Sequence, residues 1–106
     1  MIRKLHDALK NREITSTELV KKSFDTISEK DGEIQAFLSL RKEKALQRAQ
    51  EIDEQFEKGR EMNILAGIPY ATKDNMCVRG ERVTAGSKML ENYIAPYSAT
   101  VIQRLD

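Results

Sequence analysis

Lys73, Asp74 and Asn75 bring three chemically capable side chains together at the end of the stretch LAGIPYATKDNM. The approach to Lys73 is nearly uncharged. Burial disfavours the charged form of a lysine and so lowers its pKa. A lysine that is neutral part of the time can act as a general base and accept a proton from a serine hydroxyl. The stretch therefore suggests a buried Lys73 that relays protons; the alternative is a structural or solvent-exposed lysine.

Asp74 has the opposite effect, because a close carboxylate favours the protonated lysine. Neighbouring side chains of a strand, however, point to opposite faces. We therefore expect Lys73 to face a pocket while Asp74 pins a loop.

Composition limits the classes of function. The 106 residues are 40% hydrophobic and 33% charged, with a net charge of +1 and one cysteine, so one domain at most is expected. The sequence has no basic stripe, so nothing in it predicts nucleic-acid binding. Cys77 is the single cysteine, which excludes an internal disulfide and a cysteine-rich zinc site. No apolar run approaches the roughly 18 residues that a membrane span needs. A cytoplasmic protein without membrane contact is expected.

The elements that must position Lys73 fall into two parts, residues 1–62 and 63–106. The first part is predicted to be mainly helical, with helices over residues 2–11, from Thr15 to Asp31-Gly32, and over 42–58. Thr15 with Glu18 forms a capping-box pattern, and Gly59 is a C-terminal stop signal. Between the last two helices, IQAFLSL (34–40) favours a strand.

The second part is predicted to hold a short buried strand before Lys73, then loops and the start of a helix. Glycines and Pro69 interrupt residues 65–87. SKMLENY (87–93) suits a helical turn or two, and Ser98 is expected to cap a final helix. The expected fold class is α/β, with N-terminal helices plus short strands.

The run LAGIPYATKDNMCVRGERVTAGSKMLENY, continued by APYSATVIQRL, resembles the start of the amidase-signature family. EITSTELVKKSFDTISEKDGEIQAFLSL resembles the opening helices and first strand of its members. The resemblance implies that residues 1–106 are an N-terminal fragment of an amidase-signature domain, an incomplete edge portion of its large mixed-sheet fold.

By this resemblance Lys73 is the catalytic lysine of a Ser–cis-Ser–Lys triad, and Asp74 and Asn75 support its loop. The family's two serines lie in a Gly/Ser-rich segment further downstream, and no such segment occurs in residues 1–106. Ser87 corresponds to a structural turn. We therefore expect this chain alone to be inactive.

Three interpretations remain open. In the first, the chain is part of the glutamine-hydrolysing subunit of a tRNA-dependent amidotransferase that converts Glu-tRNA(Gln) to Gln-tRNA(Gln). Its partners would be the other subunits of a heterotrimer, and its substrate would be glutamine. The chain itself would hold no cofactor, because a partner subunit uses the ATP and Mg²⁺. In the second it is part of a stand-alone amidase, which TAGS (84–87) favours. In the third it is a non-catalytic helical interaction protein.

Overall fold

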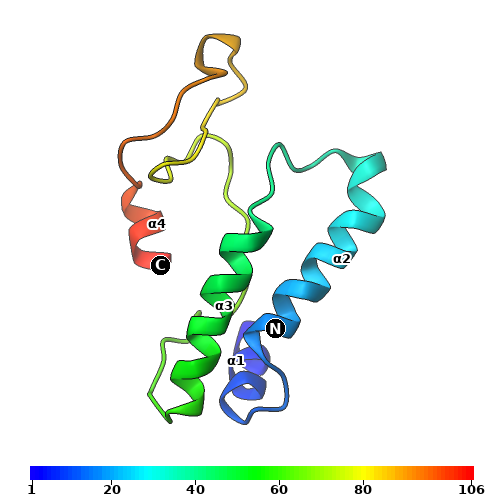
Figure 1. Ribbon diagram of the computed structural model, residues 1–106, viewed down its shortest axis with the longest axis vertical. Helices are drawn as coiled ribbons and strands as arrows, with labels where there is room; N and C mark the ends of the chain where they lie inside the picture. The colour runs from blue at the N-terminus through cyan, green and yellow to red at the C-terminus, as the bar shows by residue number, and fades with distance from the viewer. The chain divides into compact units, whose positions relative to one another are not determined.

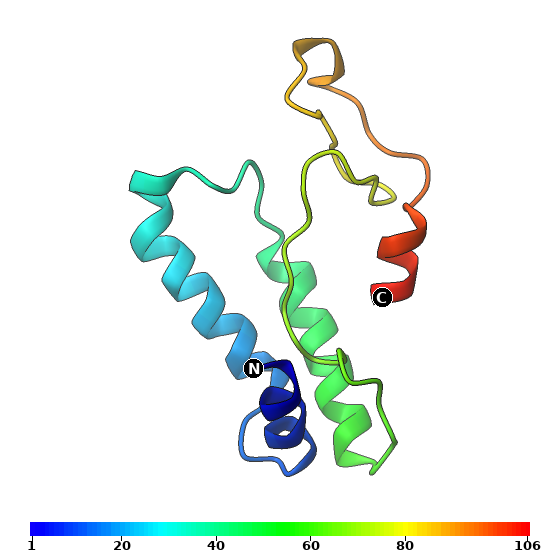
Figure 2. The same cartoon turned by 180° about the vertical axis from the view of Figure 1, so that it is seen from behind.

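The computed structural model describes residues 1–106, which divide into two compact units, Met1–Tyr70 (unit 1) and Ala71–Asp106 (unit 2). Unit 1 contains the helices α1 (Ile2–Lys10), α2 (Ser16–Ile34) and α3 (Lys42–Glu57). α2 and α3 pack along each other, and both views show them side by side (Figures 1 and 2).

α2 begins with the capping box that the sequence predicts. The Thr15 hydroxyl accepts the Glu18 backbone N–H at 3.1 Å, and the Glu18 carboxylate accepts the Thr15 N–H at 2.9 Å. These bonds satisfy backbone donors that have no partner within the helix. The predicted stop at Asp31-Gly32 is wrong, because the helix continues through Gly32 to Ile34. Gln35, with φ +52°, provides the left-handed C-cap instead.

α3 matches its predicted range within one residue. It ends before Gly59, whose φ of +69° lies in the left-handed region that glycine adopts without steric cost. Lys58 and Glu54 form an i,i+4 ion pair at 3.9 Å. Both side chains are exposed, so the pair contributes only a few tenths of a kcal/mol.

Asp53, on α3, binds the N-terminus of α2. Its carboxylate accepts the backbone N–H groups of Ser16 at 2.6 Å and Thr17 at 3.0 Å, and also the Thr17 hydroxyl at 2.7 Å. A carboxylate at this end of a helix satisfies unpaired donors and interacts favourably with the helix dipole.

Arg12 makes a second contact, at the C-terminus of α3. Its guanidinium donates to the carbonyl of Glu57 at 2.8 Å and to that of Phe56 at 3.5 Å. A cation is favourable there because the last carbonyls of a helix are unpaired and carry partial negative charge. The two contacts fix the ends of α2 and α3 in unit 1.

The core of unit 1 lies where the three helices meet the chain at Gly67. Its buried residues are Leu9, Ser16, Val20, Ala49 and Ile52. The Ser16 hydroxyl donates to the Gly67 carbonyl at 2.8 Å. A Cβ at Gly67, which has φ +80°, would lie 3.2 Å from Leu9 and from Ile52, so only glycine fits this close approach.

The two predicted strands are absent, so the α/β expectation is wrong in its strands and this chain is mainly helical. Ile34 belongs to α2, residues 35–40 form no strand, and neither does the stretch before Lys73. The pattern of a strand is local, whereas its hydrogen bonds need a second segment at the right distance. Nothing in residues 1–106 pairs with either stretch as a ladder.

Unit 2 consists of loops around the 3₁₀ turn η1 (Lys88–Leu90) and the short helix α4 (Thr100–Leu105). The predicted turn in SKMLENY is confirmed. One isolated antiparallel bridge joins Arg82 to Ile94. The buried apolar residues of this unit are Val83, Ala95 and Ile102.

Among the helices of this chain, we find none with both the length and the apolar character that a membrane span requires.

Candidate active site around Lys73

Lys73 opens a tight turn in unit 2. Its carbonyl accepts the backbone N–H of Met76 at 3.0 Å, so Asp74 and Asn75 occupy the two central positions of the turn. The Lys73 side chain is exposed. The expectation of a buried Lys73 is therefore not met by these 106 residues.

The apolar run before Lys73 explains this difference. Ile64, Leu65 and Tyr70 are 43%, 39% and 48% exposed. The run itself is therefore partly exposed and does not form the buried segment that the sequence predicts.

Asp74 pins a loop, as the sequence predicts, although it does so from a turn rather than from a strand. Its carboxylate accepts the backbone N–H of Thr84 at 3.0 Å and the Thr84 hydroxyl, while its own carbonyl accepts the N–H of Ala85 at 2.9 Å. The Thr84 hydroxyl in turn accepts the Gly86 N–H at 3.1 Å. The turn that carries Lys73 is thus fastened to residues 84–86.

These contacts explain the acidity of Asp74. The hydrogen bond from the Thr84 hydroxyl, followed by that from the Thr84 backbone, lowers the pKa of the Asp74 carboxyl below its usual value, and the charge of Arg82 adds to this. Partial burial opposes the shift without cancelling it. Asp74 therefore remains an ionised acceptor at neutral pH.

The serines of unit 2 have structural contacts. Ser87 closes a turn in which its N–H donates to the Thr84 carbonyl at 2.8 Å, in agreement with the predicted structural role. Ser98 does not cap α4, because Ala99 is the N-cap residue. The Ser98 hydroxyl instead accepts the Arg79 N–H at 3.0 Å.

The sequence pattern does not single out Thr84. Its signal is weak, since a threonine before Ala-Gly is an ordinary turn pattern, and its partner Asp74 lies ten residues away.

Cys77 is half-buried, and it raises the pKa of Tyr97 through a hydrogen bond with the Tyr97 hydroxyl.

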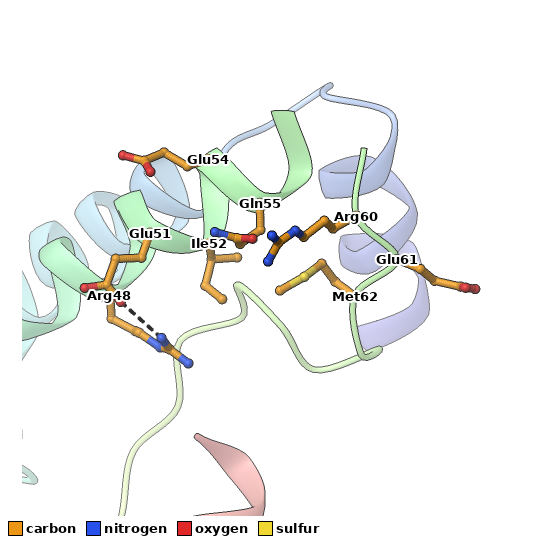
Figure 3. A pocket seen from close by; sticks show the side chains of 8 residues that line it. All are labelled: Arg48, Glu51, Ile52, Glu54, Gln55, Arg60, Glu61 and Met62. Carbon is orange, nitrogen blue, oxygen red and sulfur yellow. Dashed lines mark hydrogen bonds and ion pairs between the residues drawn. The ribbon is translucent and has the colours of Figure 1, made fainter. Parts of the chain in front are cut away.

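Unit 1 has an open hollow of about 560 Å³ between α3 and residues 60–62. Figure 3 shows Ile52, Gln55 and Met62 gathered in it, with Arg48 turned towards Glu51 at its rim, where the ion pair measures 3.0 Å. Residues of unit 1 alone line this hollow, so Lys73 is not part of its lining.

The amidase family model matches residues 18–106, which is most of the chain. The chain belongs to the amidase family, and the resemblance drawn from the lysine motif is confirmed. Within the family it is similar to the A subunit of glutamyl-tRNA(Gln) amidotransferase. The protein of that description from Prochlorococcus marinus (strain MIT 9211) is 48% identical over 97 residues, which cover 92% of this chain and 20% of the relative.

The corresponding protein from Chlamydia muridarum (strain MoPn / Nigg) is 47% identical over 102 residues, which cover 96% of this chain and 21% of the relative. The chain thus spans about a fifth of the length of the curated relatives it matches. A solved structure described as "An unexpected vestigial protein complex reveals the evolutionary origins of an s-triazine catabolic enzyme" matches with a TM-score of 0.90 and 28% identity. That match covers 96% of this chain and 22% of the solved chain.

Proposed function

We propose that this chain is the N-terminal part of the glutamine-hydrolysing subunit of a tRNA-dependent amidotransferase, which converts Glu-tRNA(Gln) to Gln-tRNA(Gln). The similarity to the amidotransferase A subunit, at 48% identity over 92% of the chain, carries this proposal. In it, residues 1–106 form the N-terminal part of a larger amidase fold. The match to a solved chain, of which they cover 22% with a TM-score of 0.90, supports this proposal.

The proposed chemistry is acyl transfer with Lys73 as the proton relay. A serine preceded by a cis peptide bond passes its proton to Lys73 and takes the proton of a second serine. The second serine attacks the amide carbonyl of glutamine, and the proton held by Lys73 returns through the first serine to the amide nitrogen. The C–N bond breaks, ammonia leaves, and water hydrolyses the acyl-enzyme to glutamate. Both serines belong to the remainder of the protein in this proposal, so residues 1–106 alone are inactive.

The remaining functions of the complex are assigned to other subunits. A partner subunit uses ATP and Mg²⁺ to activate Glu-tRNA(Gln) and receives the ammonia. Residues 1–106 hold 18 basic and 17 acidic side chains without a basic stripe, so no tRNA contact is assigned to them. The complex is assigned to the cytoplasm.

A chimeric amidotransferase tests the role of Lys73. Residues 1–106 replace the corresponding segment of the Prochlorococcus marinus relative, and glutamine hydrolysis is measured as glutamate release. Lys73→Ala is expected to lower kcat by about 10²- to 10⁴-fold, the usual contribution of a general acid–base group. Lys88→Ala is the matched control, because Lys88 is also an exposed lysine of unit 2.

Equal activity of the Lys73→Ala and Lys88→Ala chimeras would refute the catalytic role of Lys73. An inactive Lys73→Arg variant would support it further, because a guanidinium keeps the positive charge but does not give up its proton.

A stand-alone amidase is the second candidate, and the sequence TAGS at residues 84–87 favours it. The complete reading frame that encodes residues 1–106 separates the two candidates when it is assayed on glutamine and on a simple amide such as propionamide. Hydrolysis of propionamide without partner subunits would support the stand-alone amidase. A strict requirement for glutamine would support the amidotransferase.

A further inference from the structure

Two segments of unit 2 meet at a single carboxylate. One is the Lys73–Met76 turn, and the other is residues 84–86, here called the strap. Asp74 accepts the strap's Thr84 backbone N–H at 3.0 Å and its hydroxyl, and the Asp74 carbonyl accepts the Ala85 N–H at 2.9 Å. Three hydrogen bonds therefore hold the residue that directly follows Lys73.

The strap itself has a constrained backbone. Ala85 and Gly86 have φ values of +49° and +70°. Glycine adopts this left-handed region readily, whereas a residue with a Cβ rarely does, so Ala85 is the constrained residue. Its conformation persists only where the surroundings fix it. The bonds from Ala85 to Asp74 and from Gly86 to the Thr84 hydroxyl provide this fixation.

A carboxylate suits the contact at position 74. An ionised carboxylate has two oxygens that only accept, so it can bind an N–H and an O–H at once. An asparagine offers one acceptor oxygen, and its amide nitrogen only donates, so the two Thr84 bonds must share that oxygen or one of them is lost. The lowered pKa of Asp74, which arises chiefly from these two Thr84 bonds, agrees with this geometry.

We propose that Asp74 is a positioning residue, which with Thr84 fixes the Lys73 turn on the strap so that the lysine holds one position towards its serine partner. The proposal rests on the proposed function of Lys73. Geometry of this kind matters because proton transfer requires donor and acceptor within about 2.6–3.2 Å. The exposed Lys73 side chain is long and flexible, so a fixed backbone reduces the number of positions that its Nζ visits.

The test uses the chimeric amidotransferase with four variants: Asp74→Asn, Thr84→Val, Thr84→Ser and the double variant Asp74→Asn/Thr84→Val. The two disruptive single variants are each expected to lower kcat by about tenfold or more and to leave KM for glutamine within about twofold. Thr84→Ser keeps the hydroxyl and is expected to restore kcat. The double variant is expected to be no slower than the slower single variant, because both substitutions remove the same contact.

Asp25→Asn is the matched control, since Asp25 is an exposed aspartate on α2. Circular dichroism and the yield of assembled complex establish that each variant is folded before kcat is compared. Normal kcat in folded Asp74→Asn and Thr84→Val would overturn the proposal. Loss in Asp74→Asn with normal activity in Thr84→Val would also overturn it, because the charge and not the contact would then matter.

The results distinguish a failure of the proposed function from a failure of the positioning role of Asp74. Full activity of Lys73→Ala would remove the role of Lys73, whereas an inactive Lys73→Ala beside a fully active Asp74→Asn would remove only the positioning role of Asp74.

Discussion

Asp74 accepts two hydrogen bonds from Thr84 through its side chain, and both strengthen when the carboxyl group is ionised. Protonation weakens them, so the strap should be held less firmly in acid. The direction follows from linkage. The pKa of Asp74 is lower in the folded chain than its ordinary value of 3.8, so the folded state binds this proton less readily than the unfolded state does.

The stability that Asp74 contributes should therefore be present above about pH 4 and disappear as the pH falls through the lower, folded-state pKa. We expect wild type to be more stable than Asp74→Asn at pH 7, and the difference to shrink towards pH 2. Urea unfolding at several pH values measures it, with Asp25→Asn as the control for losing one exposed carboxylate. A constant difference in stability across this pH range would contradict the linkage.

In an NMR titration, Thr84→Val should raise the pKa of the Asp74 carboxyl.

Residue types at the candidate site could be predicted from the sequence, but their environment could not. The pattern around Lys73 predicts that Asp74 pins a loop, which the Thr84 contacts confirm, whereas the catalytic role of Lys73 stays a prediction. Burial of Lys73 depends on which side chains surround it in space, and the apolar residues before it are exposed in this chain. The Thr84 partner was missed because nothing local connects positions 74 and 84.

At the scale of elements, the predictions that succeeded rest on signals within a few residues. The capping box joins Thr15 to Glu18, and Gly59 follows the last turn of α3. The contact between Asp53 and Ser16 spans 37 positions and has no such signal. Strands failed for the same reason, since a ladder needs a partner that the local pattern does not name.

Gly32 gives a test of the corrected end of α2. It lies in the last turn of the helix, and a Cβ there would meet no atom within 4 Å. Gly32→Ala should therefore stabilise unit 1 by about 0.5–1 kcal/mol, because alanine loses less backbone entropy in a helix. Gly59→Ala is the matched control: its surroundings are also open, but its φ of +69° makes alanine unfavourable by about 1 kcal/mol. In thermal unfolding, the Tm of Gly32→Ala should rise and the Tm of Gly59→Ala should fall. A lower Tm for Gly32→Ala would indicate that the helix ends earlier.

At the scale of the whole molecule, few apolar side chains are buried. Seven hydrophobic residues form the buried set of the two units. Large apolar side chains that are more than a third exposed include Phe37, Leu38, Leu40 and Met89. A small core of this kind gives marginal stability, and extended apolar exposure is typical of surfaces that another protein segment covers. This exposure agrees with the match to relatives about five times longer than this chain. It also agrees with the proposal that most of the amidase fold lies outside residues 1–106.

The connector between α2 and α3 is where we expect this exposure to have its clearest effect. Phe37, Leu38 and Leu40 are 38%, 65% and 51% exposed, and their backbone forms no ladder, so the segment can pair with another chain. The isolated 106-residue chain should therefore associate as its concentration rises, which sedimentation velocity measures. Leu38→Lys should reduce the association because a charge on an exposed edge opposes pairing. Met89→Lys, at a 96% exposed site outside the connector, should reduce it less. A monodisperse monomer at every concentration would show that the exposed apolar side chains do not drive association. It would also count against the interpretation of the chain as a non-catalytic interaction protein.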